Sequence, residues 1–147
     1  MGVEWDLRSA SQEDKRALAA LIAVHKNLRP LLHAGELVHA DTDEDEAVRI
    51  EGVVSPDRTD ALYQLTGLAQ TTTWPGAPRP LPGLDSARIY HVRLATPAYE
   101  GSNYPAAWTR PGGVRLPGSY LTTTGIALPV IHPDHMLLVR VTALEAS

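Results

Sequence analysis

The sequence predicts a mainly β fold, an antiparallel β-sandwich preceded by one long N-terminal α-helix. Apolar residues between Ser9 and His33 recur at the spacing of one helix face. After Gly35 the apolar period changes to two, in short runs rich in Val, Ile, Leu, Tyr and Thr. Clusters of Pro, Gly and Asp separate these runs, and no second helical pattern lies between them, which is typical of a sandwich or barrel.

The ends of the helix are marked in the sequence. Ser11 and Asp14 have the spacing of a capping box, in which each side chain accepts a hydrogen bond from the backbone N–H of the other residue. Pro30 has no N–H and is expected to kink or end the helix. Gly35 is placed to close the segment.

Six runs are predicted as strands by their alternation and their β-branched and aromatic residues. They are Glu36–Ala40, Ala47–Val54, Ala61–Thr66, Arg88–Leu94, Ser119–Thr123 and Met136–Thr142. The stretch from Ala95 to Gly118 is polar and rich in Pro and Gly, so we expect a long irregular loop there.

Composition excludes several classes of function. The chain has 147 residues, no Cys, and 13 Lys and Arg against 17 Asp and Glu. Thiol nucleophiles, Cys-ligated zinc and disulfides are therefore excluded, and the net charge of −4 argues against nucleic-acid binding. No stretch reaches the roughly 20 apolar residues of a membrane span, and no basic-then-apolar leader follows Met1. We expect a cytoplasmic protein without a membrane partner.

The first segment predicts an incomplete unit. Gly2–Leu7 has the pattern of a strand that runs directly into the helix, as in a parallel αβ unit. No second strand of that kind follows, and a single strand with its helix cannot bury itself. We interpret this piece as the cut edge of something larger.

That segment and four later ones together resemble the C-terminal end of glycoside hydrolase family 36 α-galactosidases, the melibiases. Gly2–Leu7 with Ser9–Ser11 is similar to the Gly-hydrophobic-Glu-Trp-Asp signature that ends their catalytic barrel. The other segments, in the same order, are His25-Lys26 with Arg29–Gly35, Leu81–Asp85 with Tyr90–Val92, Gly125–Pro129, and Met136–Thr142.

The resemblance implies that residues 1–35 are the last strand and helix of a truncated (β/α)8 barrel and that residues 36–147 are a C-terminal β-sandwich domain. It implies a parent enzyme that hydrolyses terminal α-galactosides with retention and without a metal or other cofactor. The family's catalytic segments, of Lys-Trp-Asp and Trp-x-Ser-Asp type, have no counterpart in this sequence. We therefore assign no catalytic residue, and expect a structural role for the chain, with the parent's barrel as its partner.

The sequence offers few candidates for chemistry of its own. Glu4 and Asp6 share one side of the first predicted strand, but we expect polar groups at a strand end rather than the carboxyl pair of a retaining glycosidase. The acidic run at residues 41–46 lacks the Gly and the bidentate Glu of a calcium loop, so we interpret it as a solvated turn. His132 and His135 have no third ligand nearby, and no metal site is predicted.

Three tryptophans are the candidates for contact with an α-galactoside: Trp5, Trp74 and Trp108. Flat rings beside a few polar groups are typical of sugar clefts, and Tyr99 and Tyr104 lie near Trp108 in the sequence. The alternative for all of them is packing within the sandwich or against the barrel.

Two further hypotheses remain open at this point. The chain could be a free-standing carbohydrate-binding or protein-interaction module. The apolar face of the helix, with Leu18, Leu21, Ile22 and Leu28, could instead join two copies into a homo-oligomer.

Overall fold

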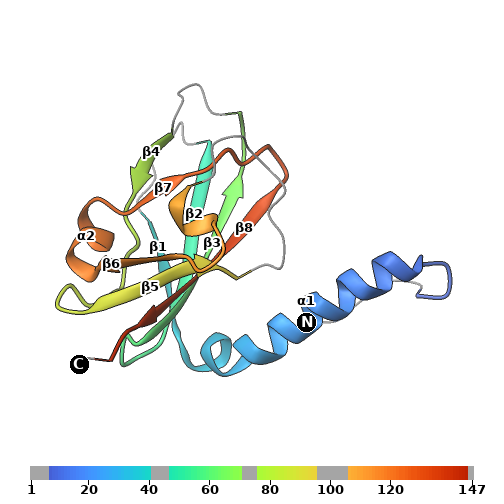
Figure 1. Ribbon diagram of the computed structural model, residues 1–147, viewed down its shortest axis with the longest axis horizontal. Coiled ribbons are helices and arrows are strands. Elements are labelled where there is room, and N and C mark those ends of the chain that lie inside the picture. Colours follow the sequence, from blue (N-terminus) through green and yellow to red (C-terminus); the bar gives the residue numbers. More distant parts are fainter. Residues whose placement is uncertain (1–6, 41–46, 71–75, 96–105, 146–147) are drawn as a thin grey trace.

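The computed structural model describes residues 7–40, 47–70, 76–95 and 106–145. A six-stranded antiparallel sheet has the order β1-β2-β3-β8-β5-β6, and β4 pairs with β7 in a second, two-stranded sheet (Figure 1). The strands are β1 (Glu36–His39), β2 (Val48–Val54), β3 (Asp60–Gly67), β4 (Gly76–Arg79), β5 (Ile89–Leu94), β6 (Val114–Pro117), β7 (Ile126–Leu128) and β8 (Met136–Ala143). The helices are α1 (Gln12–Ala34), the 3-10 turn η1 (Ala107–Thr109) and α2 (Gly118–Thr123). The predicted fold class, mainly antiparallel β with one long N-terminal helix, is confirmed.

The capping box at the start of α1 is present as predicted. The Asp14 N–H donates to Ser11 Oγ over 3.0 Å, and the Ser11 N–H donates to Asp14 Oδ2 over 3.2 Å. The helix does not end at Pro30 but continues to Ala34. Pro30 lies in the last two turns, where its missing N–H removes a single hydrogen bond, and burial of Leu31 holds this end on the sheet.

The chain turns from α1 into β1 at a point of close backbone approach. The Gly35 N–H donates to Leu31 O over 2.8 Å. A Cβ at Gly35 would lie 2.4 Å from Val53 Cγ1, so a larger residue would push the helix away from the sheet.

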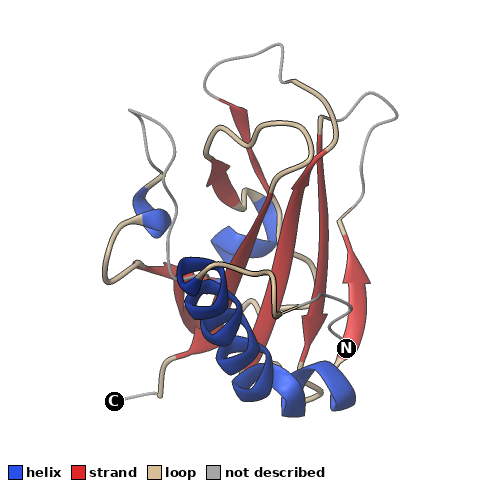
Figure 2. Ribbon diagram, turned by 90° about the vertical axis from the view of Figure 1, so that its right-hand side faces the viewer, coloured by secondary structure: helices blue, strands red, loops and turns tan. Residues whose placement is uncertain are grey.

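The two faces of the six-stranded sheet bury different layers (Figure 2). One face carries the main core beneath the β4–β7 pair, α2 and η1, and the other receives the C-terminal half of α1. Alternation along the strands assigns each residue to its face. The fully buried large side chains of the main core are Tyr63, Leu65, Leu81, Tyr90, Val92, Trp108, Leu121, Ile126, Val139 and Val141.

Ser119–Thr123, predicted as a strand, lies instead in α2. The hydroxyls of Thr122 and Thr123 donate to carbonyls one turn earlier, at Gly118 and Ser119, and Leu121 is fully buried. This local bonding satisfies the helical backbone despite the β propensity of Thr. The short strands β4, β6 and β7 were not predicted, and β6 occupies part of the expected loop from Ala95 to Gly118.

Some predictions fall outside the described residues: residues 2–6 of the first strand, the acidic turn at 41–46, and the centre of the long loop. Within the described ranges, no helix is both long and apolar enough to cross a membrane.

Candidate functional site

Only the C-terminal half of α1 is attached to the sheet. Leu28 and Leu31 are 5% and 6% exposed and form a second, smaller buried cluster with Leu62 of β3. Partly buried neighbours complete it: Val24, Leu32, Val53, Ala95 and Leu138. The first turns of α1 extend well beyond the sheet (Figure 1).

The projecting half of α1 carries an apolar face. Leu21 and Ile22 lie three and four residues after Leu18, so the three side chains lie on one side of the helix. Leu21 is 44% exposed, and neither described core cluster contains a helix residue before Val24. Apolar surface gathered in this way is a mark of an interaction site.

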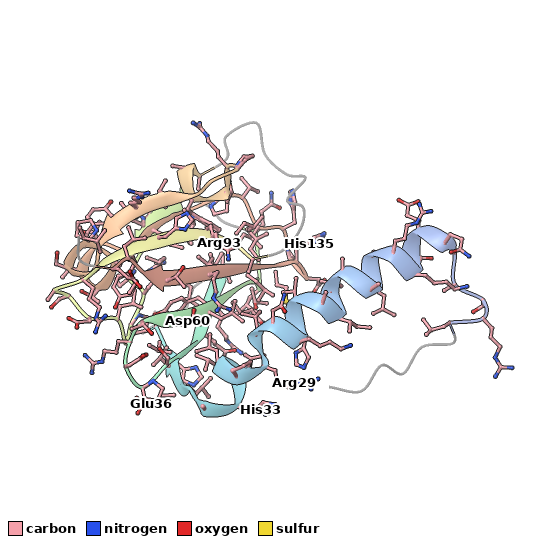
Figure 3. The ribbon with its side chains drawn as sticks, turned by 60° about the horizontal axis from the view of Figure 1, so that its bottom comes forward. Arg29, His33, Glu36, Asp60, Arg93 and His135 are labelled. Atoms are coloured by element: carbon pink, nitrogen blue, oxygen red, sulfur yellow. The ribbon has the colours of Figure 1, made fainter. Side chains whose placement is uncertain are left out.

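A groove lies between α1 and the sheet, next to this face. Val24, Asn27 and Leu28 of α1 form one wall, and the sheet contributes Arg93, Ala95 and Arg140. The groove has a volume of about 140 Å³. Figure 3 shows Arg93 on the sheet side of α1, with Arg29 and His33 on the opposite side of the helix.

One arginine of the groove is already paired. Arg140 Nη2 donates to Asp60 Oδ2, and the two side chains are 18% and 25% exposed. Burial raises the pKa of Asp60, and the neighbouring Arg140 guanidinium opposes that shift. Asp60 Oδ1 and Arg140 Nε are buried without a hydrogen-bond partner in the described part of the chain.

Three other described carboxylates accept hydrogen bonds that hold turns and a helix cap. Asp14 caps α1, and Asp85 accepts from the Ala87 N–H and Arg88 Nε. Asp57 accepts from Ser55 Oγ and from the backbone and side chain of Thr59, and these hydrogen bonds lower the pKa of Asp57 to about 2. Such bonds hold carboxylates ionised in turns and caps, which is not the environment of a catalytic acid.

The histidines do not gather. His39 Nδ1 lies 3.6 Å from Glu51 Oε1 on the neighbouring strand, and His91 Nε2 lies 2.7 Å from Gly112 O. His132 and His135 stack edge to face with ring centroids 6.1 Å apart. Over the described ranges, no three His, Asp or Glu side chains are grouped to hold a metal ion.

Trp108, a candidate for sugar contact, lies in the main core. It is 2% exposed, and its Nε1–H donates to Ala127 O over 2.8 Å. Its ring has no free face for stacking on a sugar, which favours the packing alternative for this residue. Trp5 and Trp74 lie outside the described residues, as do Tyr99 and Tyr104.

The arginines of the groove were not found by sequence reasoning. Arg93 and Arg140 stand in predicted strands, at positions that alternate with core residues, so they read as ordinary exposed residues. Their meeting depends on the pairing of β5 with β8, which places Arg93 directly opposite Arg140. Only a register assignment for these two strands could have indicated it.

Comparison with known proteins confirms the resemblance to α-galactosidases. No protein-family model matches the chain. An α-galactosidase of Escherichia coli is 31% identical over 149 aligned residues, which cover 95% of this chain and 20% of that enzyme.

Solved structures of α-galactosidases share the fold of this chain. The α-galactosidase of Lactobacillus brevis matches with a TM-score of 0.76 at 20% identity, over 98% of this chain and 18% of that one. The family 36 α-galactosidase AgaA of Geobacillus stearothermophilus matches with a TM-score of 0.73 at 23% identity, over 96% and 17%. This chain thus spans about a fifth of the length of these relatives.

Proposed function

Because this chain resembles the C-terminal region of family 36 α-galactosidases, we propose that it is the non-catalytic C-terminal domain of such an enzyme. Residues 1–35 are the last strand and helix of the parent's catalytic barrel, and residues 36–147 are the β domain that supports it. The parent hydrolyses terminal α-galactosides with retention. The contribution of this chain is structural.

The projecting half of α1 is the observation that carries this proposal. A helix whose apolar face extends past its own sheet requires a second body to cover that face. The catalytic barrel supplies that body, since α1 is the outer helix of its last αβ unit. Leu28 and Leu31 then fix the angle at which the barrel and the β domain meet.

A retaining glycosidase requires two carboxyl groups about 5–5.5 Å apart, one as nucleophile and one as acid/base. The described carboxylates with partners hold a helix cap, turns, the Asp60–Arg140 pair and the cross-strand contact of Glu51 with His39. These roles support a domain that assists catalysis only by holding the barrel.

Two measurements test the proposal. The reading frame upstream of the Met1 codon is sequenced, and it should encode a barrel with its carboxylate pair. The purified chain and the longer protein are then assayed on a chromogenic α-galactoside. We expect hydrolysis by the longer protein alone. Hydrolysis by the purified chain above a blank preparation, or the absence of a barrel upstream, would overturn the proposal.

The interface itself is tested by Leu21→Lys, with Ala23→Lys as the matched control on the opposite side of α1. In the longer protein we expect Leu21→Lys to lower stability by about 1.5–3 kcal/mol, the value of one buried leucine. The same change in the isolated chain should cost little, because Leu21 is already 44% exposed there. Ala23→Lys should be neutral in both. Equal effects of the two substitutions in the longer protein would contradict burial of this face.

A further inference from the structure

Three arginines gather on the helix-facing side of the sheet, beside the groove. Arg93 lies directly opposite Arg140 in the β5–β8 pairing, and Arg115 lies opposite His91 in the β5–β6 pairing. Directly opposite residues share a face, and His91 and Arg93 are two residues apart on β5, so all four side chains project from the same side.

This cluster carries more positive charge than the described residues around it balance. Like charges directly opposite one another destabilise a pair of strands. Asp60 compensates Arg140. Arg93 and Arg115 are exposed, and neither has an ion pair or hydrogen bond from its side chain within the described part of the chain. Among the residues that the structure describes, no anion pairs with Arg93.

The groove has the shape and chemistry to receive that anion as a carboxylate side chain. Val24, Leu28 and Ala95 offer apolar contact to a short aliphatic stem, and Arg93 offers a planar fork of N–H donors to the carboxylate. The groove, with a volume of about 140 Å³, is small enough to suit a single side chain.

We propose that carboxylate side chains of the preceding catalytic domain dock here, one in the groove against Arg93 and others across Arg115. This inference rests on the proposed function and names a second part of the same interface. The occupant follows from continuity: Val24 and Leu28 line the groove, and Leu21 of the apolar face lies one turn before Val24 and two turns before Leu28 on the same side of α1. A body that covers Leu21 therefore borders the groove and Arg93.

The test is Arg93→Glu, made in the longer protein and in the isolated chain. The measurement is the rate of tryptic cleavage within α1 after Lys15, Arg16 or Lys26. When opening is fast relative to cleavage, this rate follows the population in which α1 is undocked. Arg49→Glu is the matched control, an exposed strand arginine on the same face whose neighbour on β3 is Thr66.

We expect Arg93→Glu to accelerate cleavage of the longer protein roughly tenfold or more, as for loss of a charge-assisted hydrogen bond, and Arg49→Glu to leave the rate unchanged. In the isolated chain Arg93→Glu should not lower the thermal midpoint, because it replaces an Arg–Arg opposition by an attractive Glu–Arg pair. Arg93→Gln, which removes the charge without reversing it, should give a smaller acceleration in the same direction.

The outcomes separate the two proposals. If Leu21→Glu, which adds no tryptic site, accelerates cleavage and Arg93→Glu does not, the carboxylate docking is overturned and the interface along α1 stands. If neither substitution accelerates cleavage, both the carboxylate docking and the proposed function are overturned. If acetate stabilises the isolated chain through Arg93 while the longer protein is insensitive to Arg93→Glu, the groove takes a free anion and the docking is overturned.

Discussion

Single side chains hold this β domain together by bonding to distant backbone rather than to one another. Tyr90 is fully buried, its hydroxyl donates to Arg58 O over 2.7 Å, and it accepts from the Asp85 N–H over 2.9 Å. Tyr63 is also fully buried and donates to Pro82 O. Burial raises the pKa of both phenols, so they remain neutral donors in the folded chain. The two tyrosines thereby tie the sheet to the irregular segments that cross its end.

Tyr90→Phe tests the first of these ties. The substitution keeps the ring but leaves Arg58 O and the Asp85 N–H without their partner, and we expect a loss of about 1–3 kcal/mol of unfolding free energy. Urea unfolding of the isolated chain measures it. Tyr120→Phe is the control, because Tyr120 is 42% exposed and should change stability little. A Tyr90→Phe variant as stable as the wild type would show that water replaces the hydroxyl.

Asp57 makes the stability of the chain depend on pH. Hydrogen bonds from Ser55 and Thr59 lower the pKa of Asp57 to about 2 in the folded state. The unfolded chain has the ordinary value of about 3.9, so the contribution of Asp57 is present above that pH and is lost as the pH falls toward about 2. We expect Asp57→Asn to be less stable than the wild type at neutral pH.

The comparison of the stability of wild type and Asp57→Asn is extended from neutral to acid pH. The difference between wild type and Asp57→Asn should shrink as the pH falls from about 5 to about 2, because the wild-type carboxylate becomes protonated. Thermal unfolding at a series of pH values measures it. A difference that is constant over this range would show that the charge of Asp57 contributes nothing.

Among the elements, α1 differs from the strands in how it is stabilised. The strands β3 and β8 are paired on both sides and buried, whereas the first half of α1 has only its own hydrogen bonds and its capping box. Isolated helical segments of this length are marginal in water, so the cap is important there. Local opening of this half leaves the core intact, because the attachment begins at Val24.

Ser11→Ala should therefore act locally. Loss of an N-cap typically costs about 0.5–2 kcal/mol. In the isolated chain we expect this cost to appear as reduced helicity by circular dichroism, with the urea midpoint of the sheet unchanged. Ser11→Asp retains a capping oxygen and should restore the helicity. A parallel fall in the midpoint would mean that the first turns of α1 are part of the cooperative unit.

At the scale of the whole molecule, the local sequence pattern predicted the fold class but not the surface proposed to contact the catalytic domain. The helix with its cap and the strands β1, β2, β3, β5 and β8 follow from periodicity and turn residues. The strands β4, β6 and β7 have three or four residues each, and β4 and β6 contain a proline, which disfavours a strand assignment. Ser119–Thr123 became helical because tertiary burial of Leu121 and hydroxyl bonding outweighed strand propensity. The Arg93–Arg140 opposition depends on strand pairing between distant segments, which alternation alone does not specify.

The proposed architecture predicts how protection against hydrogen exchange is distributed. In the isolated chain, amides of β3 and β8 should exchange most slowly, because both strands lie inside the sheet, and amides of residues 15–22 should exchange fastest among the helical ones. Attachment of the catalytic domain buries the face of Leu18, Leu21 and Ile22. We then expect protection of residues 15–22 to rise at least roughly tenfold, or about 1.4 kcal/mol, with β3 and β8 as the internal control. Unchanged exchange in this half of α1 would mean that the barrel does not cover it, and the structural role proposed for this chain would have to be abandoned.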